Sequence, residues 1–286
     1  MCTRFYILPG SPDLEYIVKT AEKSPLLRRF VHNRMSKIMP GNNPDKRDRM
    51  IAQQLSFTDS DFGGSSAASS AQNNADADKA GSTSEILSIS GEIRPTDIVP
   101  VLAPDKNGNA AVYPMEWGFR LPAESGNAET PHSLQKSGQN PGRNSGRRFG
   151  PSAKGKLLVN ARSETAAVKA SFREAWACRR CIIPASWYYE WEHLTGNSGQ
   201  KRVGDKYMIQ PKGSSMTWLA GLYRIEDGLP VFAVLTKEPT EDLRRIHDRM
   251  PLILPEDRID EWINPLTNPK DILRYSIIDM VMEKAV

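Results

Sequence analysis

The sequence is poor in cysteine and histidine, and it contains no long apolar run. Among 286 residues there are three cysteines and four histidines. The cysteines are Cys2, Cys178 and Cys181, and an odd number with one close pair does not suit the disulfide framework of a secreted domain. There is no apolar run of about 18 residues and no charged-then-apolar leader. We therefore expect a soluble protein of the reducing cytoplasm, with no membrane partner.

The composition is that of a globular protein that is mildly basic. Hydrophobic residues make up 39%, charged residues make up 25%, and the net charge is +4. This charge permits a nucleic-acid surface but does not require one. Residues 58–84 and 122–155 are rich in small polar residues and have little to bury. We predict a single domain over residues 1–286 in which these two stretches are flexible insertions, the second being a solvated loop or a basic flap over a ligand.

Short β-rich runs alternate with short helices along the rest of the chain. Residues 97–103 and 110–117 are predicted to pair as a hairpin across Asn107-Gly108. Residues 156–160 are predicted to form one strand, and residues 171–174 match a capping box that opens a helix. Many hairpins mixed with helices indicate the α+β class, built mainly on antiparallel sheet.

Cys2 directly follows Met1, and this placement gives it chemistry that an internal cysteine lacks. Removal of Met1 leaves a thiol and an α-amine on one residue. An α-amine, with a pKa of about 7.7–8.0, is partly neutral at physiological pH and can attack an aldehyde. The thiol can then close on the imine to give a thiazolidine ring. The alternative is that Met1 stays and Cys2 is a small apolar residue of a first strand.

The run from Asn160 to Glu164 lies where a predicted strand meets a predicted helix. A side-chain amide at Asn160 can orient a nucleophile, and the planar fork of Arg162 suits a phosphate. Alternatively, Asn160 caps the helix and Arg162 pairs with Glu164.

Two further residues are candidates for proton transfer. Glu190 lies within an aromatic strand, where desolvation would raise its pKa toward neutrality, unless it faces solvent. His247 lies at a helix exit, where it can transfer protons or interact with the helix dipole. The other histidines, on a helix or in polar stretches, are His32, His132 and His193.

Two motifs have structural explanations that compete with functional ones. Cys178 and Cys181 form a C-x-x-C, but no second pair of zinc ligands lies nearby in the sequence and no βαβ setting for a redox motif is predicted. We interpret both as structural thiols. The ring of Trp117, before Gly118, is either part of the core or exposed for stacking on a base.

Taken together and in order, these motifs resemble the SRAP family, the SOS-response-associated peptidases, also called abasic-site-processing proteins. Thr3 and Trp187 depart from the family pattern, because glycine is usual at both positions, and they could change the shape of the site. The motifs that carry the resemblance are Met1-Cys2-x-Arg4-Phe5, Trp117-Gly118, Asn160-Ala161-Arg162-x-Glu164-Thr165, Ser171-Phe172-Arg173, Cys181-Ile182-Ile183-Pro184-Ala185 with Tyr189-Glu190-Trp191, and Ile246-His247-Asp248-Arg249-Met250-Pro251.

The resemblance implies a barrel-like fold with peripheral helices, in a monomer without cofactor or metal. It implies that the partner is single-stranded DNA containing abasic sites, and that Cys2 forms a Schiff base and then a thiazolidine with the opened sugar. By the same resemblance, Asn160 positions Cys2, Glu190 shuttles protons, and His247 assists ring opening and imine chemistry. Release of Met1 could be autocatalytic.

The resemblance also implies a set of DNA contacts. Arg4 and Arg162 would hold flanking phosphates, while Trp117 and Pro95 would line the place where the strand bends. Two other functions remain open: a cysteine peptidase or amidase acting on other substrates through Cys2 and His247, and a non-covalent single-strand-binding module.

Overall fold

The structure is a computed structural model that describes residues 3–38, 90–121, 155–195 and 200–285. Cys2, His132 and both predicted insertions, apart from Gly155, lie outside the described residues. No helix in the described part is both long and apolar enough to cross a membrane.

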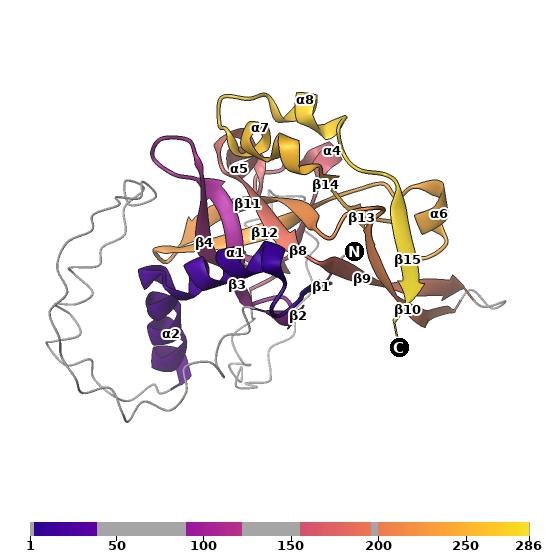
Figure 1. Ribbon diagram of the computed structural model, residues 1–286, viewed down its shortest axis with the longest axis horizontal. Helices are drawn as coiled ribbons and strands as arrows, with labels where there is room; N and C mark the ends of the chain where they lie inside the picture. Colours follow the sequence, from indigo (N-terminus) through magenta and orange to yellow (C-terminus); the bar gives the residue numbers. More distant parts are fainter. Residues whose placement is uncertain (1–2, 39–89, 122–154, 196–199, 286) are drawn as a thin grey trace, which may run out of the picture.

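Five strands close into a barrel at the centre of the molecule (Figure 1). Strand β11 hydrogen-bonds to both β8 and β12, which completes the ring. Neighbouring strands are antiparallel except β12 and β4, which run parallel. The α+β class with a mainly antiparallel, barrel-like sheet is thereby confirmed. The strands in ring order are β3 (Ile98–Pro104), β4 (Ala110–Trp117), β12 (Leu229–Lys237), β11 (Thr217–Glu226) and β8 (Arg180–Ala185).

Three short strands extend the barrel sheet. Strand β7 (Asn160–Arg162) runs parallel to β12 and pairs Asn160 with Val234. Strand β13 (Met250–Pro251) also pairs with β12, and β14 (Ile253–Leu254) pairs with β11. Strand β12 therefore holds the segment that begins at Asn160 beside the segment that follows His247.

A second sheet of five strands extends from the barrel toward the right of Figure 1. Between β8 and β9 lies Ser186, whose backbone N–H donates to Tyr6 at 2.8 Å. The chain passes there from the barrel into the second sheet. The strands in sheet order are β15 (Met280–Lys284), β10 (Lys201–Pro211), β9 (Trp187–Thr195), β1 (Arg4–Ile7) and β2 (Gly91–Ile93).

Two longer helices pack beside the barrel. Helices α1 (Pro12–Glu22) and α2 (Pro25–Ile38) both begin at a proline, which lacks the N–H that a first turn leaves unpaired. Leu14 of α1 joins the main core, and Phe30 of α2 packs in a smaller cluster with Ile98.

The remaining elements are short. Figure 1 places α4, α5, α7 and α8 together at the top of the barrel. These elements are α4 (Ser163–Ala166), α5 (Arg173–Cys178), α6 (Glu241–Arg244), a 3-10 turn (Glu256–Arg258), α7 (Ile259–Ile263), α8 (Pro269–Leu273), and the paired strands β5 (Phe119–Arg120) and β6 (Leu157–Leu158).

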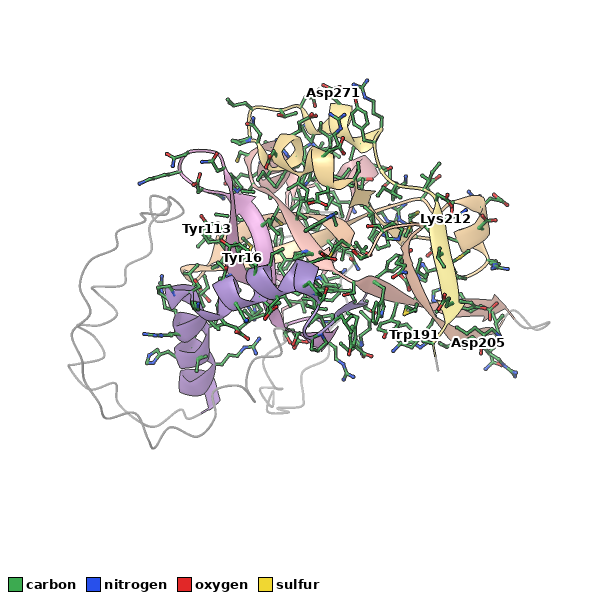
Figure 2. All side chains as sticks on the ribbon, viewed as in Figure 1. Tyr16, Tyr113, Trp191, Asp205, Lys212 and Asp271 are labelled. Carbon is green, nitrogen blue, oxygen red and sulfur yellow. The ribbon has the colours of Figure 1, made fainter. Side chains whose placement is uncertain are left out.

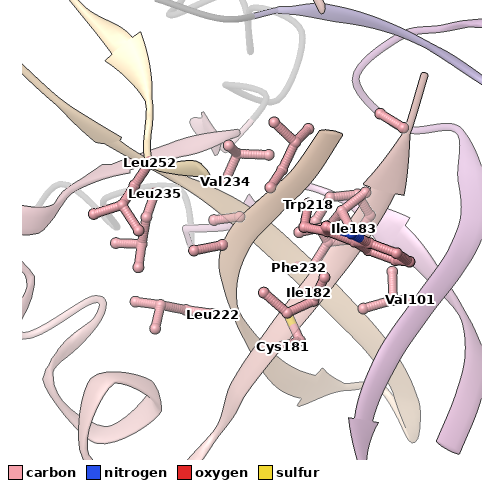
Figure 3. Close-up of a cluster of buried hydrophobic side chains, with 14 of the residues drawn as sticks. Val101, Cys181, Ile182, Ile183, Trp218, Leu222, Phe232, Val234, Leu235 and Leu252 are labelled. Atoms are coloured by element: carbon pink, nitrogen blue, oxygen red, sulfur yellow. The ribbon is translucent and has the colours of Figure 1, made fainter. Parts of the chain in front are cut away.

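Apolar side chains from all around the barrel fill its interior (Figure 3). Val101, Leu222 and Phe232 are fully buried there, and each such side chain contributes about 1.5–3 kcal/mol. Cys181 is also fully buried, and burial raises the pKa of its thiol well above the usual value, as a structural thiol requires. Cys178 is exposed, and its thiol lies 3.4 Å from the carbonyl oxygen of Glu174.

Two local predictions are wrong. The run 156–160 is not one strand, because β6 and β7 are separated at Val159, whose carbonyl accepts hydrogen bonds from Trp117 and Val234. The capping box does not form either. Helix α5 begins at Arg173 with Phe172 at its N-cap, without a side-chain cap.

Arg180 is a charged side chain that is fully buried in the barrel. It is fully buried at the start of β8, and its guanidinium lies 5.6 Å from the centre of the Trp262 ring. Five backbone carbonyls surround it, so its N–H donors are satisfied without a carboxylate. They belong to Trp262 (2.6 Å from Nε), Trp176 (3.0 Å from Nη1), Ala177 (2.8 Å from Nη1), Thr267 (2.9 Å from Nη2) and Asn264.

Candidate active site

Glu190 is a buried carboxyl in the middle of β9. Its side chain is 4% exposed, so it does not face solvent as the alternative interpretation supposed. Burial raises its pKa to about 7, and the nearby Asp248 carboxylate acts in the same direction. A carboxyl with this pKa is populated in both protonation states at neutral pH, so it can donate or accept a proton. Trp191, the next residue, is labelled at the right of Figure 2, where β9 has left the barrel.

His247 follows α6 and is 6% exposed. Its Nδ1 accepts a hydrogen bond of 3.0 Å from the Arg249 backbone N–H. Burial lowers its pKa to about 4, although Asp248, with Oδ1 2.9 Å from Nδ1, opposes this shift. The imidazole is therefore neutral at pH 7, and because Nδ1 is the acceptor, the proton is on Nε2. In this tautomer His247 is a hydrogen-bond donor through Nε2 and a weak base.

His193, set aside by the sequence analysis, packs against His247. The two ring centroids are 4.2 Å apart, and the positive charge that His193 can carry contributes to the low pKa of His247. The His193 backbone N–H donates to the Ile246 carbonyl at 2.9 Å, which ties the His247 loop to β9. The only signal in the sequence is its position three residues after Glu190. With Asp248, these two histidines form a group that could hold a metal ion.

The Asn160 and His247 segments are joined through Arg249. Its Nη2 donates to Glu164 and to the Thr236 carbonyl, each at 2.8 Å. Glu164 thus pairs with Arg249 rather than with Arg162. Asn160 does not cap α4, because the N-cap residue of that helix is Arg162. Asn160 instead lies half-buried on β7, beside β12.

The predicted phosphate contacts differ in their surroundings. Arg162 is exposed. Arg4 is partly buried, and its Nε lies 3.2 Å from Oε1 of Glu92. Glu92 also binds Lys206 at 3.0 Å, so a phosphate at Arg4 would compete with an existing ion pair. Pro95 is half-buried in the turn between β2 and β3.

Trp117 is part of the core. It does not lie at a DNA-facing surface, as the resemblance implied. The ring is fully buried, stacks on Phe232 at a centroid distance of 6.0 Å, and lies tilted against Phe5 at 5.0 Å. Its indole N–H donates to the Val159 carbonyl at 2.9 Å. No face of this ring is open to a base in the structure.

The backbone conformation at Gly118 explains why the second residue of the Trp-Gly motif is glycine. Its φ of +125° favours glycine, and a Cβ there would lie 2.7 Å from Leu157 Cδ1. Its N–H donates to the Phe232 carbonyl at 2.7 Å. The motif thus lets the chain turn close to β12 after the buried tryptophan.

Trp187, which departs from the family pattern, lies in an aromatic group on the second sheet. It stacks on Tyr6 with ring centroids 4.6 Å apart and an interplanar angle of 3°, and Tyr189 contacts it edge-on at 6.5 Å. Lys206 lies over the Tyr189 ring at 3.7 Å. Trp187 therefore places a packed ring two strand positions from Tyr189.

The described chain begins at Thr3, directly beside the candidate site. Arg4 pairs with Tyr189 in the antiparallel register of β1 and β9. One further step of that register leads from Arg4 and Tyr189 to Thr3 and Glu190. The site thus combines a carboxyl that titrates near neutrality with a neutral imidazole, next to the start of the chain. This combination suits proton transfer to and from a reacting group.

Comparison with known proteins identifies the class. The family model for SOS response associated peptidase (SRAP) matches residues 64–284, and the chain belongs to this family. The abasic site processing protein YoaM of Bacillus subtilis is 38% identical over 129 residues, which are 43% of this chain and 55% of that protein. The abasic site processing protein YedK of Escherichia coli is 29% identical over 121 residues, or 40% and 50% of the two chains. The matches span about half the length of these relatives.

A solved structure supports the fold. A crystal structure of a protein from Bacteroides thetaiotaomicron has a TM-score of 0.50 and 22% identity, with 71% of this chain and 80% of that chain covered. The family resemblance and the fold class predicted from the sequence are therefore confirmed.

Proposed function

We propose that this protein processes abasic sites by linking itself covalently to them in single-stranded DNA, through Cys2 after Met1 has been removed. The observation that carries the proposal is the buried Glu190 carboxyl with a pKa of about 7. Thr3, the first described residue, adjoins the pairing of Arg4 with Tyr189, and Cys2 precedes it in the sequence. The names of the relatives, abasic site processing proteins, support abasic sites as the substrate.

The reaction begins with opening of the abasic sugar. The ring oxygen takes a proton while the C1′ hydroxyl loses one, which leaves an aldehyde. The Nε2–H of the neutral His247 is suited to hydrogen-bond to that ring oxygen, while the proton itself is delivered by the protonated form of Glu190 or by solvent. General acid catalysis of this kind is worth about 10²–10⁴-fold in rate.

Crosslinking then forms two bonds and releases one water. The Cys2 amine adds to the aldehyde carbon, and the resulting carbinolamine loses its hydroxyl as water to give an imine. The thiol sulfur adds to the imine carbon, and its proton ends on the nitrogen of the thiazolidine. Glu190 takes a proton from the attacking amine and gives one to the departing hydroxyl. Asn160 positions Cys2 in this scheme.

The proposed DNA contacts favour a single strand. A flexible single strand can bend into a pocket at no cost in base pairing, whereas a duplex must first be opened. Arg162, which is exposed, holds a flanking phosphate, and Arg4 does so by exchanging Glu92 for phosphate. Pro95 lines the bend. Binding should therefore weaken as salt rises, because phosphate contacts release counterions.

The family name raises a second candidate, hydrolysis by a Cys2 thiol. A cysteine peptidase needs a base to activate the thiol, and the pKa of about 4 makes His247 a weak one. This observation favours crosslinking over hydrolysis of other proteins. Release of Met1 at the same site stays a separate proposal, since an ordinary aminopeptidase also removes methionine before cysteine.

The test uses an abasic single-stranded oligonucleotide and a denaturing gel. Wild type with Met1 removed, as verified by intact mass, should give a heat-stable covalent band. Cys2→Ala with Met1 removed should give only an imine that borohydride traps. A heat-stable band from Cys2→Ala would contradict the proposed thiazolidine. A shift on a native gel without any covalent band from wild type would leave the non-covalent module as the function.

A further inference from the structure

Three potential metal ligands lie close together at the candidate site. His193, His247 and Asp248 each offer one ligand atom, and these atoms all lie within 4.8 Å of one another. Asp248 Oδ1 is 2.9 Å from His247 Nδ1. Two ligands bound to one tetrahedral zinc ion are about 3.3 Å apart, so this pair needs to open by only a few tenths of an ångström.

The backbone already holds two of these ligands in place. The hydrogen bond of 2.9 Å from the His193 N–H to the Ile246 carbonyl fixes the distance between β9 and the loop. Arg249, on the other side of Asp248, is anchored to Glu164 and Thr236. The histidines therefore need little ordering to bind an ion together. His193 and Asp248 are exposed, so an ion can enter from solvent.

We propose that His193, His247 and Asp248 form a binding site for a divalent transition-metal ion of the Zn²⁺ class. The ion binds His247 at Nδ1, the nitrogen nearest Asp248, where it replaces the Arg249 N–H, and water fills the open coordination position. Two imidazoles with one carboxylate select zinc-like ions, whereas Mg²⁺ prefers oxygen ligands and retains its waters.

The ion is an inhibitor rather than a cofactor of the proposed crosslinking. The ion draws His247 away from its hydrogen bond with Arg249. It also occupies the space beside the imidazole that is proposed to assist opening of the sugar. Bound zinc would thus slow covalent capture of DNA, and chelation would restore it. This effect on rate rests on the proposed function, whereas the ion site itself does not.

The site is tested by Zn²⁺ titration calorimetry of the full chain and by Co²⁺ absorption. Cys2→Ala serves as the background, so that its thiol cannot act as a ligand. We expect one ion per chain, and His193→Ala and Asp248→Asn should each weaken binding at least about tenfold, since even partners of metal ligands contribute 10–100-fold. His32→Ala is the matched control, because His32 is an exposed histidine on α2, and it should bind as the background does. Excess Mg²⁺ should not compete.

The possible results distinguish a failure of the metal-site proposal from a failure of the proposed crosslinking function. Absence of saturable binding, or equal affinity in His193→Ala and the background, would overturn the metal site. Circular dichroism of each variant shows whether a loss of zinc binding reflects a loss of folding. Asp248 is exposed, so Asp248→Asn should remove a ligand without unfolding the protein. In wild type, Zn²⁺ should lower the crosslinking rate. In His193→Ala, Zn²⁺ should lower that rate by a smaller factor. A wild type that never crosslinks, while the ion still binds, would refute the proposed function alone.

Discussion

Arg180 and Glu190 lie ten residues apart on consecutive strands, and both are buried, but their surroundings differ. Arg180 is enclosed by five backbone carbonyls at the helical end of the barrel. Burial lowers the pKa of Arg180, but arginine keeps its charge in proteins. Glu190, on the second sheet, has a pKa of about 7 because the effect of burial exceeds that of the interactions that lower the pKa, such as the backbone hydrogen bond from Trp191. A buried charge that the backbone satisfies stabilises the fold, whereas a buried carboxyl that titrates near neutrality suits proton transfer.

Glu190 and His247 also make stability depend on pH in opposite directions. The Glu190 pKa rises from 4.5 to about 7 on folding, so its contribution is lost as pH rises through that range. The His247 pKa falls from 6.5 to about 4, so its contribution is present above pH 6.5 and is lost as pH falls toward 4. Between pH 4.5 and 6.5 the two effects therefore oppose each other and largely cancel, so each is seen only when the other group is removed.

The largest change in stability is expected from Arg180→Met. The substitution leaves buried carbonyls without their donors, which should lower the free energy of unfolding by about 3–5 kcal/mol. Urea unfolding measures the loss. Arg173→Met, at an exposed arginine on α5, is the control and should change the free energy by no more than about 0.5 kcal/mol. Equal effects of the two substitutions would mean that the carbonyl cage is not a stabilising feature.

A smaller and pH-dependent change is expected from Glu190→Gln. The amide cannot ionise, so the variant should gain stability over wild type as pH rises from 5 to 8, by up to about 3 kcal/mol. Urea unfolding at both pH values measures the difference. Glu174→Gln, whose side chain is 73% exposed in wild type, should unfold like wild type at each pH. If the difference between Glu190→Gln and wild type were the same at both pH values, Glu190 would not have a raised pKa.

The smallest change is expected from Glu164→Gln. Loss of the charged partner of Arg249 should lower the free energy of unfolding by about 1–2 kcal/mol, since a hydrogen bond to a charged group is weakened. Crosslinking should slow less than tenfold, because Arg249 keeps the Thr236 carbonyl. Glu261→Gln breaks a more exposed pair with Arg258 and should cost about 0–1 kcal/mol. A crosslinking rate equal to wild type would show that Arg249 does not position the His247 loop.

The parts of the fold that are encoded locally could be predicted from the sequence. The β3–β4 hairpin forms as expected, with Gly108 at φ +84° and the Asp105 side chain accepting from Asn107 and Asn109. Strands β11 and β12 are joined through Asp227 and Gly228, both at positive φ, as their turn chemistry favours.

Strands with distant partners could not be predicted. Strands β2, β5 and β15 were missed, since they are two to five residues long. Strand β2 pairs with β1, and β15 pairs with β10, far away in the sequence. Such short runs become strands only because a partner edge is already present, and no local pattern reports that.

The residues of the candidate site could be predicted from the sequence, but their burial and their neighbours could not. The sequence analysis selected Glu190 and His247 from their chemistry, but only the fold shows that Glu190 is buried and that His193 packs on His247. Trp117 was placed at the DNA surface by resemblance and lies in the core instead. Arg180 gave no signal, because its five acceptors are contributed by two separate parts of the chain, 176–177 and 262–267.

The most direct test of the contrast between the two buried charges is a single-turnover pH profile of crosslinking to an abasic single-stranded oligonucleotide, for wild type and Glu190→Gln. Wild type should show an ionisation near pH 7. Glu190→Gln should lack that ionisation and react about 10²–10⁴-fold more slowly, yet reach a covalent end point, because Glu190 transfers protons but forms no bond to the DNA. Identical rates and identical profiles for the two proteins would contradict the account and leave Glu190 as a structural residue.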